Sequence, residues 1–269
     1  MSDPERTVNE GSVALVTTAR RPDPSAALAG RQLAEKIGAR FVERGDRPIT
    51  ALQAGDLPVI VIEQDRVVCH LDGQTFFFHP GLIRMRRMGG PDGSREPLIE
   101  ALDPHEGDLI LDATLGRGGD AILIADAVGE TGRVIGVEAS PVVAELTRIG
   151  LASYHGPTPE LERAMRRIEV VAMDHLEYLN ACASGSFDMV YLDPMFDTPL
   201  SGSSSLDPLR PLARHDPLRR EAVDAAIRVA RRRVVVKSRR GAATLRDLGI
   251  QQTSGGRWSR VSYGIIPCV

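Results

Sequence analysis

The sequence predicts an α/β protein in two parts, a small N-terminal α/β domain over residues 1–90 and a larger α/β domain over residues 91–269. From residue 96 onward, short apolar runs alternate with helical patterns, which is typical of a mainly parallel sheet covered by helices on both faces. Before residue 90, the apolar runs lie closer together and include a hairpin signal. The glycine-rich stretch at 89–93 is the expected joint between the two parts.

The first part combines short strands with one helix. Three apolar runs are expected to be strands, namely residues 12–18, 41–42 and 59–62. Between the first two runs, residues 24–37 have a helical pattern that begins with Pro24 and Ser25. Residues 67–71 and 75–78 flank Asp72 and Gly73, and an Asp-Gly pair between apolar runs predicts a β-hairpin.

The second part has a longer series of strands. Five are expected, at residues 109–111, 134–137, 170–173, 189–192 and 234–236. Helical patterns follow the first two of them, at 121–127 and 141–151. Residues 250–253 and 260–266 flank a glycine turn and predict a closing hairpin. The Ser- and Pro-rich stretch at 201–217 is expected to be a mobile loop.

The composition is that of an ordinary globular protein, with 42% hydrophobic and 26% charged residues. A formal charge of −3 and a pI near 6.1 give no overall attraction to nucleic acid, so RNA binding must come from local basic patches. Cys69, Cys182 and Cys268 are widely spaced, so we expect neither a disulfide framework nor a metal site. The chain shows no signal pattern and no membrane-length apolar run, which favours a cytoplasmic protein without membrane contact.

A glycine-rich turn follows the strand that ends at Asp112. Gly116, Gly118 and Gly119 allow the backbone to bend sharply and allow a ligand to approach where a Cβ would otherwise stand. The helix that begins near Asp120 directs its first N–H groups toward this turn, where they could hold a carboxylate. The turn is therefore a candidate cofactor site, although glycines of this kind also make ordinary strand-to-helix turns.

Acidic residues end the next two strands as well. Glu138 is placed to accept hydrogen bonds from two ribose hydroxyls, and Asp174 and His175 lie where an adenine ring would be. These acids could instead cap helices, but three successive strands that each end in an acid favour a nucleoside-type cofactor. A nicotinamide dehydrogenase is the rival interpretation. The spacing is not G-x-G-x-x-G, however, and Asp112 stands where that motif has no acid.

The fourth strand of this series, at residues 187–192, leads directly into Asp193, Pro194, Met195 and Phe196. The Asp193 carboxylate and the Pro194 carbonyl can accept the two N–H bonds of an exocyclic base amine, and Phe196 can stack on the base. An Asp-Pro pair is also a common turn at a strand end. Its position after a cofactor-type turn favours the catalytic interpretation.

Three segments together resemble one protein family: residues 112–120, residues 190–196 with their Asp-Pro-Met-Phe sequence, and residues 233–237. They are similar to the bacterial small-subunit ribosomal RNA methyltransferase J family, over about residues 76–269. The resemblance implies a Rossmann-like, seven-stranded methyltransferase sheet, S-adenosylmethionine as cofactor, and the N2 amine of a guanine in 16S ribosomal RNA as acceptor. It also implies a set of cofactor-lining residues: Gly119, Asp120, Glu138, Ala139, Asp174, His175 and Asp193.

Two basic groups are candidates for contacts with RNA phosphates. Arg84, Arg86 and Arg87 precede the joint, and Lys237, Arg239 and Arg240 follow the fifth strand. The first group could equally be the solvated face of a short helix. The expected partner is 16S ribosomal RNA or the 30S subunit. DNA adenine or a small-molecule amine as acceptor, and a non-catalytic RNA-binding role, remain alternatives, and the oligomeric state stays open.

Overall fold

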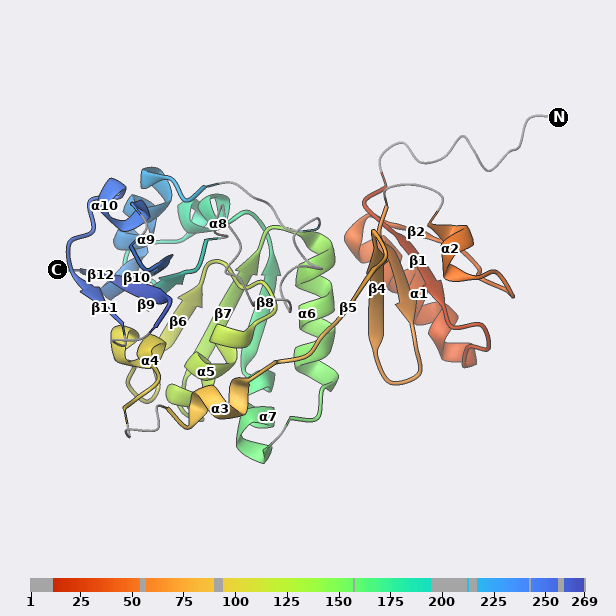
Figure 1. The fold of residues 1–269 in the computed structure, drawn as a ribbon, viewed down its shortest axis with the longest axis horizontal. Helices are drawn as coiled ribbons and strands as arrows, with labels where there is room; N and C mark the ends of the chain where they lie inside the picture. Colours follow the sequence, from red (N-terminus) through yellow and green to blue (C-terminus); the bar gives the residue numbers. More distant parts are fainter. Residues whose placement is uncertain are drawn as a thin grey trace. The chain divides into compact units, whose positions relative to one another are not determined.

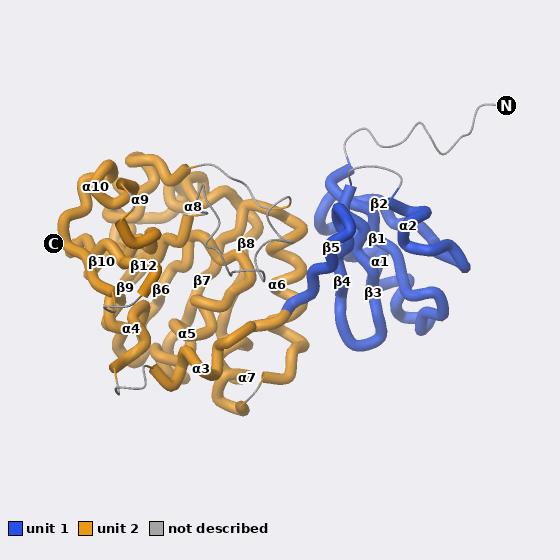
Figure 2. Tube along the Cα trace, viewed as in Figure 1, with its two compact units in different colours: residues 1–78 blue, residues 79–269 orange. Residues whose placement is uncertain are grey.

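The computed structural model describes residues 12–53, 57–89, 94–156, 158–194, 212, 217–241, 243–255 and 259–268. The chain divides into two compact units, residues 1–78 and 79–269 (Figure 2). This division precedes the joint expected near residue 90, because helix α3 (Ile83–Arg87) packs against helix α5 (Gly119–Ala127) of the second unit. Most of the Ser- and Pro-rich stretch at 201–217 lies outside the described residues, as does Phe196.

The first unit is a five-stranded sheet in the order β2-β1-β3-β4-β5 (Figure 1). Its strands are β1 (Leu15–Thr18), β2 (Arg40–Phe41), β3 (Val59–Ile62), β4 (Val67–Leu71) and β5 (Gln74–Phe77). The first three are parallel, and β4 and β5 continue the sheet in antiparallel fashion. The expected hairpin is confirmed: Asp72 and Gly73 both have positive φ, at 48° and 71°, as a tight two-residue turn requires.

Two helices accompany this sheet. Helix α1 (Pro24–Ile37) begins after Asp23, whose side chain accepts a hydrogen bond from the Ser25 N–H. The helix ends at Gly38 in the left-handed conformation, with φ 69°. The short helix α2 (Ile49–Leu52) contributes Leu52 to a small apolar cluster with residues of β1 and β3.

The second unit contains a seven-stranded sheet in the order β11-β12-β10-β9-β6-β7-β8. The strands are β6 (Leu109–Asp112), β7 (Arg133–Glu138), β8 (Ile168–Ala172), β9 (Phe187–Leu192), β10 (Ala230–Arg239), β11 (Thr253–Ser254) and β12 (Val261–Pro267). Strands β6 to β10 are parallel to one another, and β12 runs antiparallel to β10 and β11. This arrangement confirms the predicted fold class. The strand order reverses between β6 and β9, and in such sheets ligands bind beside the reversal, at the carboxyl ends of the strands.

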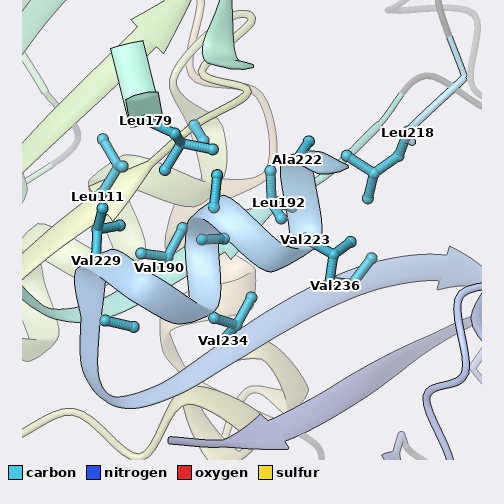
Figure 3. Packing of buried hydrophobic residues seen from close by; sticks show 14 of the residues in the cluster. Leu111, Leu179, Val190, Leu192, Leu218, Ala222, Val223, Val229, Val234 and Val236 are labelled. Atoms are coloured by element: carbon cyan, nitrogen blue, oxygen red, sulfur yellow. The ribbon is translucent and has the colours of Figure 1, made fainter. Parts of the chain in front are cut away.

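Helices cover both faces of this sheet (Figure 1). Besides α3 and α5 they are α4 (Pro97–Leu102), α6 (Pro141–Ser153), α7 (Pro159–Arg166), α8 (His175–Ala181), α9 (Arg220–Val229) and α10 (Thr244–Asp247). Figure 3 shows Leu179 of α8 and Val223 of α9 packed with Val190 of β9 and Val234 of β10. Alternate strand residues face the opposite side, where the Tyr191 hydroxyl reaches Asp120 of α5. No helix among the described residues is long and apolar enough to cross a membrane.

Candidate cofactor and acceptor site

The polar residues expected to form the site meet at the carboxyl ends of the central strands. Asp112 ends β6 and pairs in register with Tyr191 of β9, next to the point where the strand order reverses. Strands β9 and β10 run parallel in a register that places Lys237 beside Asp193. The sheet therefore brings together side chains that lie more than a hundred residues apart in the chain.

The glycine turn between β6 and α5 has the backbone conformation that the sequence predicts. Gly116 and Gly118 have φ values of 51° and 72°, and Gly118 is the residue that precedes the first turn of α5. A Cβ built at Gly116 or Gly119 would meet no atom within 4 Å, so the space beside the turn is open. Open space next to the N–H groups of a nine-residue helix suits the carboxylate end of a cofactor.

Glu138 is held against this turn from the end of β7. Its Oε2 accepts a hydrogen bond from the Gly116 N–H at 3.0 Å, and its Oε1 accepts one from the Ser140 N–H at 2.8 Å. Burial raises the pKa of Glu138, and these backbone N–H groups partly offset the rise. Because a carboxylate has about four acceptor sites, Glu138 keeps capacity for hydroxyl groups of a nucleoside.

Ala139, Asp174 and His175 lie at the ends of the next strands. Ala139 is partly exposed between Glu138 and the first turn of α6. The Asp174 carboxylate caps α8 by accepting from the Leu176 N–H at 2.9 Å, so the capping role considered from the sequence is present. Its side chain is 30% exposed, and its other oxygen lies 4.0 Å from Nδ1 of His175. Both side chains keep an exposed part at this edge of the sheet, as a cofactor contact requires.

A network of buried charges lies on the α5 side of the sheet. The Lys237 ammonium donates to Oδ2 of Asp193 at 2.8 Å and to Oδ2 of Asp120 at 3.0 Å. Oδ2 of Asp120 also accepts from the Tyr191 hydroxyl at 2.6 Å, and its Oδ1 accepts from Arg86 at 2.6 Å. The side chains of Asp120, Lys237 and Asp193 are 11%, 17% and 27% exposed, so these contacts are largely shielded from water.

The electrostatics differ between the three acids of this region. Burial raises the pKa of Asp120, but the charges of Lys237 and Arg86 outweigh it and hold the pKa below its usual value. Burial lowers the pKa of Lys237, and the neighbouring carboxylates raise it well above that of a free lysine. The pKa of Asp193 is raised by burial, which Lys237 offsets only in part. Burial raises the pKa of Asp112 well above its usual value.

Two residues have contacts that the sequence does not predict. Asp120 is expected to line the cofactor, but both of its oxygens are bonded to side chains of the network. Lys237 is expected on an RNA-binding surface, but it lies between Asp120 and Asp193 with its ammonium bonded to both. The physical reason is the sheet register, which turns Lys237 toward the two carboxylates and leaves it little exposed surface for a phosphate.

The other basic candidates are at the surface. Arg84 of α3 is exposed, and Arg87 is bonded through Nε to Asp126 at 2.7 Å. Arg239 and Arg240 are exposed at the carboxyl end of β10, and the Arg240 side chain donates to the Ser259 carbonyl at 3.4 Å. The paired Arg87 agrees with the alternative interpretation of a solvated helix face. Arg239 and Arg240 lie at the same end of the sheet as Asp193.

Several contacts of the site are not among those that the sequence predicts. Thr114 accepts a hydrogen bond from the Asp193 N–H at 2.6 Å and so ties the end of β9 to the glycine turn. Arg86 of α3 also bonds to Glu96 at 2.6 Å, which joins the start of α4 to the network. Tyr191 has a sequence signal, a hydroxyl within the apolar run at the end of β9. Thr114 has none, because its contact depends on the folded positions of distant segments. Arg86 is expected beside RNA phosphates together with Arg84 and Arg87, but its guanidinium is bonded to Asp120 and Glu96.

Comparisons with known proteins agree with this geometry. Residues 73–262 match the family described as "Putative SAM-dependent methyltransferase", where SAM is S-adenosylmethionine. The chain is 36% identical over 225 residues to YpiP of Bacillus subtilis, a match that covers 83% of this chain and 88% of that protein. It is 28% identical over 254 residues to ribosomal RNA small subunit methyltransferase J of Pseudomonas paraeruginosa, covering 90% of each chain.

A solved structure supports the same fold. The SAM-dependent methyltransferase NGO1261 from Neisseria gonorrhoeae superposes with a TM-score of 0.65, covering 94% of this chain and 96% of that one, at 20% identity. At this identity the likeness concerns the fold alone. The family match covers well over half of the chain and includes the glycine turn and the carboxyl ends of the central strands. The chain therefore belongs to this family of SAM-dependent methyltransferases, and S-adenosylmethionine is its cofactor.

Proposed function

We propose that this methyltransferase transfers a methyl group to an exocyclic base amine, the N2 amine of a guanine in 16S ribosomal RNA. The observation that carries the proposal is the position of Asp193 and Pro194, which leave β9 beside the reversal of the strand order. Relatives named ribosomal RNA small subunit methyltransferase J support ribosomal RNA as the substrate class.

The residues at the carboxyl ends of β6, β7 and β8 would hold S-adenosylmethionine. The open turn from Gly116 to Gly119 would take its carboxylate, Glu138 its ribose hydroxyls, and Asp174 with His175 the neighbourhood of its adenine. When bound, the cofactor supplies a methyl group already activated on a sulfonium. The remaining task of the protein is to orient the acceptor, and no covalent nucleophile is required.

Asp193 and Pro194 would orient the acceptor amine. Within the described part of the chain, Asp193 accepts a side-chain bond only through Oδ2, from Lys237, which leaves Oδ1 for an N–H of the amine. The Pro194 carbonyl, partly exposed, can accept the second N–H. Two acceptors in fixed positions draw the nitrogen lone pair out of conjugation with the ring and direct it at the methyl group. Phe196 would stack on the base.

Local basic residues would provide the contacts with RNA. With a formal charge of −3 the whole chain does not attract RNA, so the phosphate contacts must come from clusters. Arg239 and Arg240 at the carboxyl end of β10 are the better candidates, and Arg84 and Arg87 on α3 are the second group. These contacts would place the target nucleotide at Asp193.

The substitution Asp193→Ala tests this proposal. We expect the variant to bind S-adenosylmethionine with an affinity within about tenfold of the wild type, because the cofactor contacts remain, and to lose methyl transfer to RNA. Calorimetry measures the first quantity, and tritium transfer from labelled cofactor to 30S subunits and to free 16S RNA measures the second. Asp224→Ala, which removes an exposed carboxylate from α9, is the matched control and keeps both properties.

The same assay separates the alternatives. Transfer to DNA or to a metabolite pool, without transfer to RNA, would move the acceptor to DNA adenine or a small-molecule amine. Binding of RNA without any transfer would favour a non-catalytic RNA-binding role. Unchanged turnover by Asp193→Ala on RNA would contradict the role proposed for Asp193.

A further inference from the structure

Lys237 is an unusual cation in this chain. Lys and Arg together number 33, yet Lys36 and Lys237 are the only lysines. Lys237 lies within β10 after three buried valines, and its ammonium bonds to one carboxylate of α5 and one at the end of β9. A compact ammonium can sit between two single carboxylate oxygens, whereas the planar guanidinium of arginine favours paired contacts with one carboxylate.

We propose that Lys237 is a positioning residue for methyl transfer, which fixes the orientation and the negative charge of Asp193 by bridging it to Asp120. The inference rests on the proposed function, in which Asp193 orients the acceptor amine. Lys237 holds Oδ2 of Asp193 at 2.8 Å, and among the described residues the other oxygen, Oδ1, has no side-chain hydrogen bond and can accept an N–H.

The bridge is itself held from several elements. Asp120 receives Arg86 of α3 at 2.6 Å and the Tyr191 hydroxyl of β9 at 2.6 Å, so it cannot turn away from Lys237 without losing two bonds. The Asp193 backbone is fixed by its N–H bond to Thr114 at 2.6 Å. Side chain and backbone of Asp193 are therefore restrained independently, as precise placement of an acceptor requires.

The charges around Asp193 show why a cation is needed here. Asp120, Asp112 and the hydroxyls of Tyr191 and Tyr263 face this region from α5, β6, β9 and β12, and the positive groups that face it are Lys237 and Arg86. Without Lys237, the buried Asp193 would lie beside Asp120 with only the more distant Arg86 to balance both. Its protonated form would then be favoured at higher pH. A carboxyl that holds a proton on the oxygen facing the amine cannot accept the N–H.

The test compares Lys237→Met, Lys237→Arg and the matched control Lys36→Met, which removes the other, exposed lysine from α1. For Lys237→Met we expect kcat to fall by about 100-fold or more, while the cofactor affinity measured by calorimetry stays within about threefold. Its pH profile of kcat should lose activity at a higher pH on the acid side than the wild type does. Lys237→Arg keeps the charge and should keep the acid limb in place with a smaller loss of kcat.

A second readout needs neither substrate nor cofactor. In Lys237→Met the pKa of Asp193 rises further above its unfolded value, so the folded state binds more protons and loses stability as pH rises through this pKa. The melting temperature of Lys237→Met should therefore fall, relative to the wild type, as pH rises from the ordinary carboxyl pKa through the raised pKa of Asp193, whereas Lys36→Met should show no such trend. This measurement also applies if Lys237→Met is less stable overall.

The outcomes distinguish the two proposals. If the wild-type protein methylates RNA and Lys237→Met keeps its kcat and its acid limb, the positioning role is overturned and the proposed function stands. A parallel fall of cofactor affinity and kcat in both Lys237 variants would also overturn it. If the wild-type protein methylates no RNA, the proposed function fails, and a pH-independent difference in melting temperature would overturn the charge role by itself.

Discussion

At the scale of single residues, the acids at the strand ends have different roles, although the sequence presents them alike. Asp120 accepts hydrogen bonds from Arg86, Tyr191 and Lys237. Among the described residues, the hydrogen bonds to Glu138 come from backbone N–H groups, so it keeps acceptor capacity. Backbone anchoring fixes the position of a carboxylate without using all of its acceptor sites. We therefore propose Glu138 as the acid that binds the cofactor.

The substitution Glu138→Ala should lower the affinity for S-adenosylmethionine by about tenfold or more, which corresponds to at least ~1.4 kcal/mol, because hydroxyl contacts and the anchor of Gly116 are both lost. Calorimetry with the cofactor measures the change. Glu130→Ala is the control, since the Glu130 side chain is 79% exposed and forms a long ion pair with Arg163, at 3.6 Å. An unchanged affinity in Glu138→Ala would mean that this residue serves only to brace the glycine turn.

At the scale of elements, the turn from β6 into α5 uses glycine for two different reasons, a backbone conformation at one position and access for a ligand at another. Gly118 requires φ 72°, a conformation that an L side chain adopts at a cost, while Gly119 has an ordinary backbone and open space at its Cβ position. Gly118 is thus needed for the fold of the turn. Gly119 is needed, on the proposed function, for the approach of the ligand.

These demands predict opposite behaviour for two neighbouring substitutions. Gly118→Ala should reduce the free energy of unfolding by about 1–2 kcal/mol, as measured by urea denaturation. Gly119→Ala should leave the free energy of unfolding unchanged or slightly raise it. The variant should also bind the cofactor more weakly, because the added methyl group enters the open space beside the glycine turn. If Gly119→Ala binds the cofactor as well as the wild type does, the ligand does not approach the turn at this point.

The elements themselves were open to prediction to different degrees. Strands β6 to β10 are short apolar runs between polar segments, and the hairpin at Asp72 and Gly73 carries its own turn signal, so both follow from local sequence. Helix α9 has apolar residues at helical spacing, so it could also have been predicted from the local sequence pattern. Helix α3 is short and is held by the contacts of Arg86 with Glu96 and Asp120. No local sequence pattern predicts these contacts.

The candidate site likewise contains residues that could be predicted from the sequence and residues that could not. The acids at the strand ends were predictable because the carboxyl ends of parallel strands share one edge of a sheet. The burial of Lys237 could not be predicted from the sequence, because it depends on the register of β9 with β10 and on the face of the sheet that α5 covers. A lysine followed by two arginines looks in sequence like one basic patch. In the fold, the strand separates the buried lysine from the exposed arginines that follow it.

At the scale of the whole molecule, an overall negative charge must be reconciled with the proposed RNA substrate. Arg239 and Arg240 offer a local solution at the carboxyl end of β10, near Asp193, while Arg231 at the amino end of the same strand pairs with Asp188. The double substitution of Arg239 and Arg240 to Ala should weaken RNA binding and reduce the slope of log affinity against log salt by about 1–2. Cofactor affinity should be unchanged.

Filter binding at several salt concentrations measures that slope. The control is the pair Arg163→Ala and Arg231→Ala, which removes two arginines of α7 and of the amino end of β10, both 55% exposed. The account expects the control to leave the slope unchanged. Equal loss of salt dependence in both double variants would place the RNA elsewhere than the carboxyl end of β10.

The central claim is that Asp193 orients the N2 amine of a guanine in 16S ribosomal RNA for methylation. The most direct measurement is nucleoside mass spectrometry of 16S RNA after incubation with S-adenosylmethionine and either wild-type protein or Asp193→Ala. The account predicts N2-methylguanosine as the new nucleoside with the wild-type protein and none with the variant. A different methylated nucleoside, or equal amounts of N2-methylguanosine from both proteins, would contradict it.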